Sequence, residues 1–281
     1  MISIKGVMRM AVVAAMVLVA AGPALANINK ADPANGNPTT EFPGVGRFGD
    51  AGGFTTSATT IFDGRHILVA RHSVTVDGSI TGDLRPASAF RFEAYGTTYQ
   101  GQQMYANFGA DLAVIRIDGI VPTGYQLWSP QSGSEIGLTF QAVGFGYADT
   151  DADGYWGPGG LGTKRLFANR VDAVAQGGLP GQGTVLKYDF DLLSGDPVGD
   201  LEGIAGPGDS GGGAFIPIGS EWLLAGLISS SGDPVDQARG SLVRIADYRE
   251  AISNVVPEPT SILLLASAVV PLLLRSVRRS R

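Results

Sequence analysis

The sequence predicts an all-β fold of short antiparallel strands, and two observations support that prediction. Glycine accounts for 41 of the 281 residues, about twice its usual share in globular proteins. Short apolar or alternating runs lie between the glycines, a spacing that is typical of sandwiches and barrels with tight turns. The chain lacks the alternating helix and strand patterns that would indicate a parallel sheet.

Residues 1–26 have the features of a secretory signal peptide. Lys5 and Arg9 precede an apolar run over 10–21, and the motif Ala-Leu-Ala follows at 24–26. A basic start, a short apolar core and a small-residue site are typical of a signal that is removed after export. The apolar run is also short for a membrane span. We therefore expect cleavage directly after this motif.

The body of the chain, over about 27–256, is long enough for one large domain or two small ones. It carries 14 basic and 25 acidic residues, a net charge of about −11, within a whole chain at −6. Nucleic-acid binding depends on Lys and Arg meeting phosphates, so this balance argues against such a partner. The chain has no cysteine, which excludes disulfides, thiolate metal sites and cysteine nucleophiles.

The body begins with a proline-containing lead-in over 27–46, for which we expect an extended conformation. The strands that follow share apolar or alternating patterns: Phe54–Phe62, His66–Ala70, Phe90–Tyr95, Leu112–Ile117, Leu138–Gly144, Leu186–Phe190 and Leu223–Ile228. Prolines and glycines over 120–137 indicate a connection between two halves. Apolar residues at helical spacing predict one amphipathic helix over 245–256, which Pro257 ends.

Ser210 lies in the glycine-rich stretch GPGDSGGG at 206–213, where backbone N–H groups gain conformational freedom beside a hydroxyl. A serine nucleophile needs a base, most often a histidine. The only histidines, His66 and His72, both precede Ser210, so the α/β-hydrolase order is excluded. The order Asp-His-Ser is not excluded by counting, but neither histidine is followed by the glycine-rich run expected there. The order His-Asp-Ser remains.

His72 closes the apolar run that His66 opens. A residue at the end of a barrel strand reaches a cleft, whereas one at its start lies on the far side, and this favours His72. Asp111 comes just before the alternating strand over 112–117. A buried aspartate that accepts a hydrogen bond from the histidine Nδ1–H fixes the tautomer and stabilises the imidazolium.

Three segments, LVARHSV at 68–74, DLAVIRI at 111–117 and GPGDSGG at 206–212, occur in this order. Together they resemble the signature segments of the trypsin-like (chymotrypsin-fold) serine proteases, and the likeness extends over about 41–256. It implies two six-stranded antiparallel β-barrels with a C-terminal helix, the first barrel within 27–125 and the second within 126–256. It also implies a serine endopeptidase without a cofactor, whose catalytic residues are His72, Asp111 and Ser210.

The same resemblance implies that the N–H groups of Gly208 and Ser210 form the oxyanion hole. The Gly-Phe-Gly motif at 144–146 is similar to a short turn of the family. Asp209 resembles the residue that pairs with a newly freed N-terminus in many relatives, yet no Arg-Ile-Val-Gly-Gly cleavage site is present. Arg71 stands where the family usually has Ala, and a cation turned toward the base would disfavour the imidazolium.

The substrate pocket is also expected from the resemblance. Ile204, six residues before the nucleophile, would lie at its floor, and the small residues Ser229, Ser230, Ser231 and Gly232 would form its walls. Ser229 further resembles the serine that supports the aspartate. An apolar floor favours an apolar residue before the scissile bond, since a buried cation would stay unpaired. A shift of one or two positions would instead bring Asp200 or Glu202 to the pocket and favour basic residues.

A separate acidic stretch contains Asp149, Asp151 and Asp153, followed by Gly154. The spacing is that of the start of a Ca²⁺ loop, but the twelfth position is Gly160 rather than Glu, so no EF-hand is complete. The favoured interpretation is a solvated acidic turn, with calcium binding as the weaker hypothesis.

Residues 257–281 combine Pro-Glu-Pro, an apolar stretch over 260–274 and four arginines. They resemble the PEP-CTERM sorting signal of Gram-negative bacteria, which an exosortase is thought to process. This implies a transmembrane helix before processing, and a final place in the cell envelope, on the cell surface or outside the cell. A simple tail anchor is the plainer alternative.

The sequence thus leads to an exported serine endopeptidase as the first hypothesis, with proteins or peptides as substrates. The alternative is a surface-anchored binding protein that keeps the protease fold with weak or no catalysis. Arg71 and the missing activation site favour that alternative. An esterase that uses the same three residues differs only in its substrate.

Overall fold

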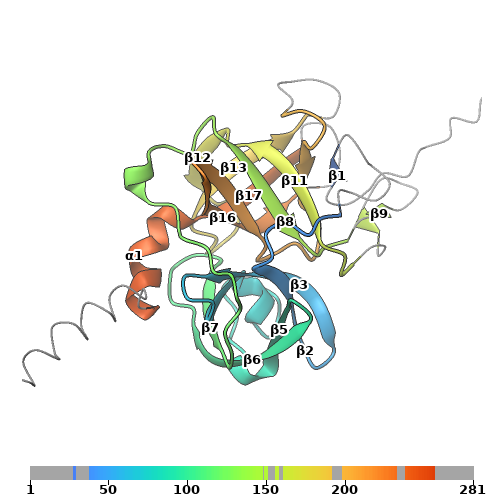
Figure 1. Ribbon diagram of the computed structural model, residues 1–281, viewed down its shortest axis with the longest axis vertical. Helices are drawn as coiled ribbons and strands as arrows, with labels where there is room; N and C mark the ends of the chain where they lie inside the picture. The colour runs from blue at the N-terminus through green and yellow to red at the C-terminus, as the bar shows by residue number, and fades with distance from the viewer. Residues whose placement is uncertain are drawn as a thin grey trace, which may run out of the picture.

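The structure of the protein, a computed structural model, describes residues 28–29, 38–147, 149–150, 156–157, 161–191, 198–232 and 238–256. It is mostly β-structure with one α-helix near the end of the chain (Figure 1). The strands form a closed six-stranded barrel and, beside it, an open seven-stranded sheet. The all-β prediction is confirmed at this level.

The closed barrel is antiparallel and has the strand order β2-β3-β4-β7-β6-β5. Its strands are β2 (Val45–Asp50), β3 (Gly53–Ile61), β4 (His66–Val69), β5 (Phe90–Ala94), β6 (Thr97–Tyr105) and β7 (Ala113–Ile117). Its loops contain the 3₁₀ helices η1 (Arg71–Val74) and η2 (Ala87–Ala89). Two of the barrel strands lie close to candidate site residues: His72 comes three residues after the end of β4, and Asp111 comes two residues before the start of β7.

The second unit is an open sheet in the order β11-β8-β15-β16-β17-β13-β12, where a six-stranded barrel was expected. Its strands are β8 (Thr139–Gly144), β11 (Arg165–Arg170), β12 (Ala173–Gln176), β13 (Thr184–Phe190), β15 (Gly213–Ile218), β16 (Glu221–Ser231) and β17 (Ala238–Arg244). Two short pairs join β1 (Ile28–Asn29) to β14 (Gly203–Ile204) and β9 (Asp149–Thr150) to β10 (Trp156–Gly157). The helix η3 (Pro130–Ser132) and the final helix α1 (Ile245–Val255) complete the described elements.

All seven predicted strands are present, and α1 ends one residue before its predicted end. Six longer strands were not predicted: β2, β6, β11, β12, β15 and β17. The segment 120–137, for which a connection between two halves was predicted, contacts both the barrel and the sheet. Tyr125 forms a β-bridge with Ile61 of the barrel, and Leu127 forms one with Leu224 of the sheet, so this segment is paired with both halves.

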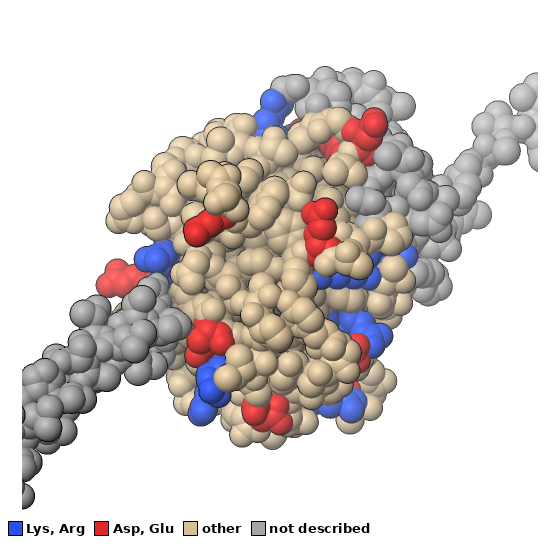
Figure 2. All heavy atoms as spheres, viewed as in Figure 1, with Lys and Arg blue, Asp and Glu red and all other residues tan. Residues whose placement is uncertain are grey.

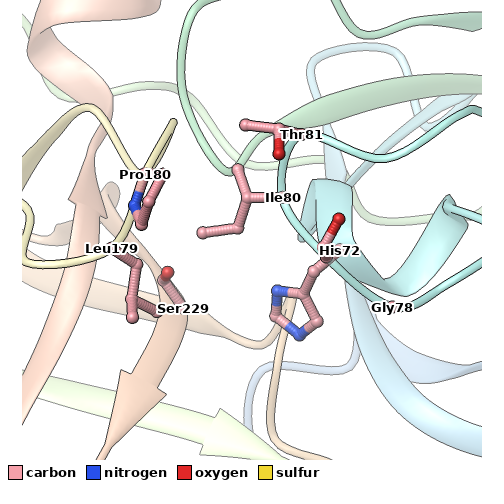
Figure 3. A pocket seen from close by; sticks show the side chains of 8 residues that line it. His72, Gly78, Ile80, Thr81, Leu179, Pro180 and Ser229 are labelled. Carbon is pink, nitrogen blue, oxygen red and sulfur yellow. The ribbon is translucent and has the colours of Figure 1, made fainter.

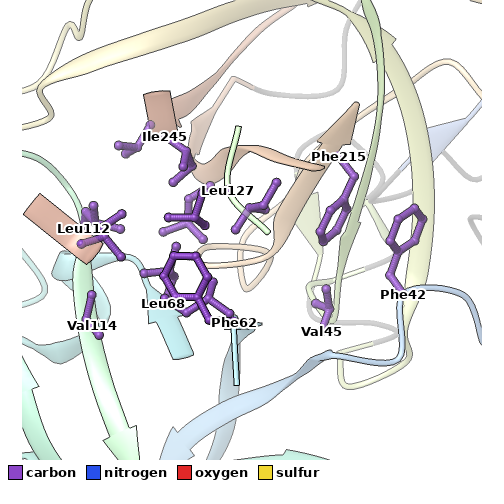
Figure 4. Packing of buried hydrophobic residues seen from close by; sticks show 14 of the residues in the cluster. Phe42, Val45, Phe62, Leu68, Leu112, Val114, Leu127, Phe215 and Ile245 are labelled. Atoms are coloured by element: carbon purple, nitrogen blue, oxygen red, sulfur yellow. The ribbon is translucent and has the colours of Figure 1, made fainter. Parts of the chain in front are cut away.

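A large apolar cluster joins the barrel, the sheet and α1 (Figure 4). Leu68 and Leu112 enter it from the barrel, Phe215 from the sheet and Ile245 from the helix. The rings of Phe42 and Phe215 stack with their centroids 4.4 Å apart. Full burial of such a side chain stabilises the fold by about 1.5–3 kcal/mol. The cluster therefore holds the barrel and the sheet in a fixed relation.

An ion pair fixes the connecting segment to the start of α1. Glu135 is fully buried and accepts hydrogen bonds from Nε and Nη2 of Arg244, both at 2.9 Å. This fork-shaped geometry is the strong form of the Arg–carboxylate pair. It ties the chain that leaves the barrel to the helix that ends the fold.

The signal peptide, the segment 257–281 and the acidic residues Asp151 and Asp153 lie outside the described residues, so these predictions stay open. In the part of the chain that is described, no helix has the length and apolar character needed to cross a membrane.

Candidate active site

Three side chains that are far apart in the sequence form one hydrogen-bonded line. His72 lies in η1, directly after β4, and Asp111 lies just ahead of β7. Ser210 comes from the loop between β14 and β15, on the side of the sheet. The His72 ring lies between the other two, with Nδ1 2.8 Å from Asp111 Oδ2 and Nε2 2.9 Å from Ser210 Oγ. A carboxylate only accepts, so Nδ1 donates to Asp111 and Nε2 accepts from the serine hydroxyl.

Asp111 is fully buried, and three hydrogen bonds to its carboxylate and one from its backbone hold it in place. Oδ1 accepts the backbone N–H of His72 at 2.9 Å. Oδ2 accepts from the His72 ring and from the hydroxyl of Ser229, the latter at 2.7 Å. One further bond joins its backbone N–H to the carbonyl of Gln182. A charge without water needs such partners, and here they also orient the imidazole.

The other histidine is not part of this arrangement. His66 opens β4, at the end opposite to His72, and its Nδ1 lies 3.4 Å from Asp63 Oδ1. Burial lowers the pKa of the His66 imidazole, against the opposing influence of Asp63. The structure therefore brings His72, and not His66, to Asp111 and Ser210.

The barrel holds the Ser210 loop through hydroxyl groups of β3. Ser57 donates its backbone N–H to the Ser210 carbonyl at 3.1 Å and its hydroxyl to the Gly208 carbonyl at 3.0 Å. Thr59 donates its hydroxyl to the Gly211 carbonyl at 3.1 Å. Ser57 and Thr59 are both fully buried. In a chain without cysteine, these bonds connect the loop of Ser210 to the barrel.

The peptide before Gly208 has a fixed orientation. The Pro207 carbonyl accepts the backbone N–H of Tyr147 at 2.8 Å. In a trans peptide the N–H points opposite to the carbonyl, so the Gly208 N–H points away from Tyr147. Gly208 has a φ of +91°, in the region that only glycine adopts readily. An added Cβ would also lie 3.0 Å from the Gly146 Cα and from the Thr55 carbonyl oxygen.

The peptide before Ser210 is fixed in the same way. The Asp209 carbonyl accepts the backbone N–H of Gly212 at 2.8 Å, which turns the Ser210 N–H in the opposite direction. Within the described residues, neither the Gly208 N–H nor the Ser210 N–H has a hydrogen-bond partner. Two backbone donors beside a nucleophilic hydroxyl are the arrangement that stabilises a developing oxyanion.

The Asp209 side chain is completely buried and is directed at Gly146 and Gly206. Its Oδ1 accepts the Gly146 N–H and its Oδ2 accepts the Gly206 N–H, each at 2.8 Å. Burial raises the pKa of the carboxyl to about 6, while these two bonds and the charge of Arg165 act to lower it. The carboxylate thus has partners without any freed N-terminus.

This contact also explains the Gly-Phe-Gly motif at 144–146. A Cβ on Gly144 would lie 2.1 Å from Asp209 Oδ1, and one on Gly146 would lie 2.8 Å from its Cγ. Neither site has room for a side chain while the Asp209 carboxylate is in place. The glycines are therefore required by packing against Asp209.

A cavity of about 310 Å³ opens beside Ser210. It is lined by Gly206, Pro207, Ser210, Ile228, Ser229, Ser230, Ser231 and Gly232, which includes every wall residue expected from the sequence. Ile204, the expected floor, is not among the lining residues and lies fully buried in the core of the sheet. It is part of β14, which pairs with β1, so this strand keeps it away from the cavity.

The acidic alternatives do not reach this cavity either. Glu202 is buried, and its carboxylate oxygens accept the backbone N–H groups of Asp191 and Val198 at 2.7 and 3.1 Å. Asp200 is exposed on a turn. Neither is among the residues that line the cavity.

A second cavity, of about 360 Å³, is lined by His72 (Figure 3). Ile80 faces it from the barrel, and Leu179 and Pro180 face it from the loop between β12 and β13. Ser229 lines both cavities. Sequence reasoning missed this site, although Leu179 and Pro180 form an apolar pair inside a glycine-rich turn. The two loops that meet here are almost 100 positions apart.

Arg71, next to the candidate base, is directed at a neighbouring loop. Its Nη2 donates to the Gly82 carbonyl at 3.1 Å. The guanidinium is thus bonded to the segment that carries Ile80.

No group of three or more metal-ligating side chains exists among the described residues. Asp149, the one candidate calcium ligand in the described ranges, begins the short strand β9. Asp151 and Asp153 lie outside the described residues, so the calcium hypothesis stays untested.

No protein-family model matches the chain, and no curated protein is significantly similar to it. The function is therefore inferred from the arrangement of His72, Asp111 and Ser210 and from the two cavities beside them.

Proposed function

We propose that the protein is an exported serine endopeptidase of the trypsin-like type, which cleaves peptide bonds through an acyl-enzyme. The observation that carries this proposal is the position of the His72 ring, within 2.9 Å of Ser210 Oγ and 2.8 Å of Asp111 Oδ2. A nucleophile, a base and an orienting group in this line are the elements that acyl transfer requires.

In the first half of the reaction, Ser210 Oγ attacks the carbonyl carbon of the scissile peptide. The hydroxyl proton passes to His72 Nε2 as the new C–O bond forms. Asp111 accepts the Nδ1–H throughout and stabilises the resulting imidazolium. The C–N bond then breaks, and the leaving amine takes the proton from Nε2.

In the second half, a water molecule attacks the ester that joins the substrate to Ser210. His72 Nε2 accepts a proton from this water, and the ester oxygen of Ser210 later takes it back. The acid product leaves with the oxygen of the water. In both halves, the N–H groups of Gly208 and Ser210 donate to the carbonyl oxygen while it carries negative charge.

The fold is compatible with this function. We interpret the closed barrel and the open sheet as the two halves of a chymotrypsin-type fold, with the site between them. His72 and Asp111 would come from the first half, and Ser210 and the oxyanion donors from the second. The shared apolar cluster keeps the parts of the site in register.

The cavity beside Ser210 favours an apolar residue before the scissile bond. None of the described residues that line it carries a charge. A Lys or Arg side chain would lose water there without gaining a charged partner among these residues, which is costly. The small side chains of its walls leave room for a residue such as Leu, Phe or Val.

The alternative of an inactive, protease-like binding protein has less support from the geometry. Arg71 is bonded to the Gly82 carbonyl, and the Asp209 carboxylate is bonded to two backbone N–H groups. The two features that favoured this alternative therefore have local explanations. An esterase on the same residues is distinguished only by its substrate.

Proteins or peptides are the proposed partners, rather than nucleic acids. On the face shown in Figure 2, basic and acidic side chains are scattered among uncharged residues. The excess of acidic residues in the body agrees with this view. Export through residues 1–26 and processing of 257–281 by sorting machinery of the exosortase type remain part of the proposal.

The proposal is tested by digesting a mixed peptide library with the purified body, residues 27–256, and with its Ser210→Ala variant. We expect cleavage by the parent only, mainly after Leu, Phe or Val. No cleavage by a folded parent, or equal cleavage by the variant, would contradict the endopeptidase. Cleavage mainly after Lys or Arg would contradict the apolar pocket but not the endopeptidase.

A further inference from the structure

Gln182 is a buried polar residue close to the proposed catalytic residues. It lies in the loop between β12 and β13, between two glycines, and only 1% of its surface is exposed. Its backbone carbonyl accepts the N–H of Asp111 at 3.2 Å. The loop is thus bonded directly to the residue that orients His72.

The side chain of Gln182 has more partners than its backbone. Nε2 lies 3.0 Å from the hydroxyls of Ser229 and Ser230, and 3.3 Å from that of Ser241. Oε1 accepts the backbone N–H of Leu179 at 3.2 Å. Because only the amide oxygen can accept that N–H, the amide nitrogen must face the three hydroxyls.

The orientation of the Gln182 amide determines the direction of the hydrogen bonds at the Ser229 hydroxyl. A hydroxyl has one proton to donate, and Asp111 Oδ2, 2.7 Å away, can only accept. The Ser229 proton therefore goes to Asp111, and its oxygen is left to accept from Gln182 Nε2. Hydrogen bonds of one direction polarise one another and strengthen along a chain.

We infer that Gln182 is a positioning residue for the proposed reaction and acts on Asp111 through Ser229. It does not touch the reacting atoms. Because Gln182 donates to the Ser229 oxygen, the Ser229 hydroxyl donates its proton to Asp111. Asp111 in turn holds the His72 ring in line with Ser210. The inference rests on the proposed endopeptidase activity and adds a residue that connects this line to the β12–β13 loop.

A double-mutant cycle on the body, residues 27–256, separates this role from a merely structural one. The variants are Gln182→Met, Ser229→Ala and their combination, with Gln176→Met as the matched control. Gln176 is an exposed glutamine on β12, at the start of the same loop. The substrate is an aryl ester of N-acetyl-leucine, which has no residue to occupy the cavity beside Leu179.

We expect Gln182→Met to lower kcat about tenfold, the effect of one lost hydrogen bond to a buried group. In the Ser229→Ala background the same change should lower kcat less than about twofold, because the group it acts through is gone. Gln176→Met should leave kcat unchanged. Equal losses in both backgrounds would indicate general loosening and overturn the inference.

Gln182→Glu gives a second measurement, which is informative even if the Met variant folds poorly. Glutamate has nearly the same shape but accepts only, and it adds negative charge near Asp111 and His72. Added negative charge favours the protonated imidazole, so the acidic limb of the pH–kcat profile should move to higher pH. An unmoved limb would overturn the inference.

The result also distinguishes this inference from the proposed function. A parent without Ser210-dependent hydrolysis would contradict the endopeptidase itself. A parent that hydrolyses the ester normally, with an unchanged kcat in the folded Gln182→Met variant, would overturn only the role of Gln182.

Discussion

The hydroxyl of Ser57, on β3 of the barrel, donates to the carbonyl of Gly208, 3.0 Å away in the loop of Ser210. These residues are 151 positions apart. The same hydroxyl accepts the backbone N–H of Phe145 at 2.9 Å. The Ser57 hydroxyl oxygen therefore connects three segments: strand β3 of the barrel, the turn at Phe145, and the loop that would supply the oxyanion donors.

Ser57→Ala should weaken both catalysis and stability. The variant leaves the Gly208 carbonyl and the Phe145 N–H without partners, which costs about 1–3 kcal/mol for a buried group. We expect kcat to fall about tenfold, with a smaller change in KM, and the urea midpoint to fall. Ser73→Ala, on the 3₁₀ helix beside His72, is a control with no hydroxyl partner in the structure. An unchanged kcat in Ser57→Ala would show that the bond does not hold the loop.

Gly208→Ala tests the orientation of the proposed oxyanion donor. Its positive φ disfavours a side chain, and the added Cβ would contact two neighbouring segments. We expect kcat/KM to fall by about 10²–10³, the loss seen when one such donor is removed. Gly219→Ala is the matched control, since Gly219 also has a positive φ, +62°, but no atom within 4 Å of the added Cβ. Similar losses in both variants would mean that strain alone is responsible.

The cavity beside His72 should bind an apolar side chain of the substrate. Leu179→Ser places a hydroxyl in its wall, and we expect KM to rise several-fold for peptides that carry Leu or Val at the second residue before the scissile bond. Peptides with Gly there should be affected little. Leu84→Ser is the control, because Leu84 is a similarly exposed leucine that does not line the cavity. An equal rise in KM for both peptide series would contradict this assignment.

Asp209 should make stability depend on pH in a predictable direction. Burial raises its pKa from 3.8 to about 6 in the folded state. Between these values the folded state binds more protons than the unfolded state, so the free energy of unfolding falls as pH rises. Asp209→Asn cannot ionise and should lack this fall.

The measurement is urea unfolding at pH 4.5 and pH 7, with Ser210→Ala in both proteins to prevent self-digestion. The stability of the Asp209 protein relative to Asp209→Asn should decrease between pH 4.5 and pH 7. A constant difference would mean that the carboxyl has an ordinary pKa, and an increase would mean that its charged form is favoured by its surroundings.

The strands that the sequence predicted are those whose apolar pattern is continuous, such as β4 and β7. The missed strand β6 has exposed residues on both faces and three glutamines, so its alternation is weak. β15 begins inside the glycine run after Ser210. Glycine has no side chain, so this run shows no alternating apolar pattern that would predict a strand. Phe215 of β15 belongs to the apolar cluster between the barrel and the sheet, and this contact could not be predicted from the sequence around it.

The candidate catalytic residues were accessible from sequence because each stands beside a short motif with a fixed order. Ile204 was predicted as the pocket floor by counting positions back from Ser210. Counting could not show that Ile204 belongs to strand β14 and is buried in the core. Ser57 and Gln182 were missed for a different reason. A buried hydroxyl or amide whose partners lie far along the chain leaves no local pattern, so its role becomes visible only in three dimensions.

The central claim is that Ser210 is a nucleophile activated by His72, and covalent labelling by a fluorophosphonate tests it most directly. The purified body is labelled, digested and mapped by mass spectrometry, beside Ser210→Ala, His72→Ala and His66→Ala. We predict one adduct, on Ser210, that is lost in Ser210→Ala, strongly reduced in His72→Ala and retained in His66→Ala. A folded parent that is not labelled, or an adduct that depends on His66 instead of His72, would contradict the account.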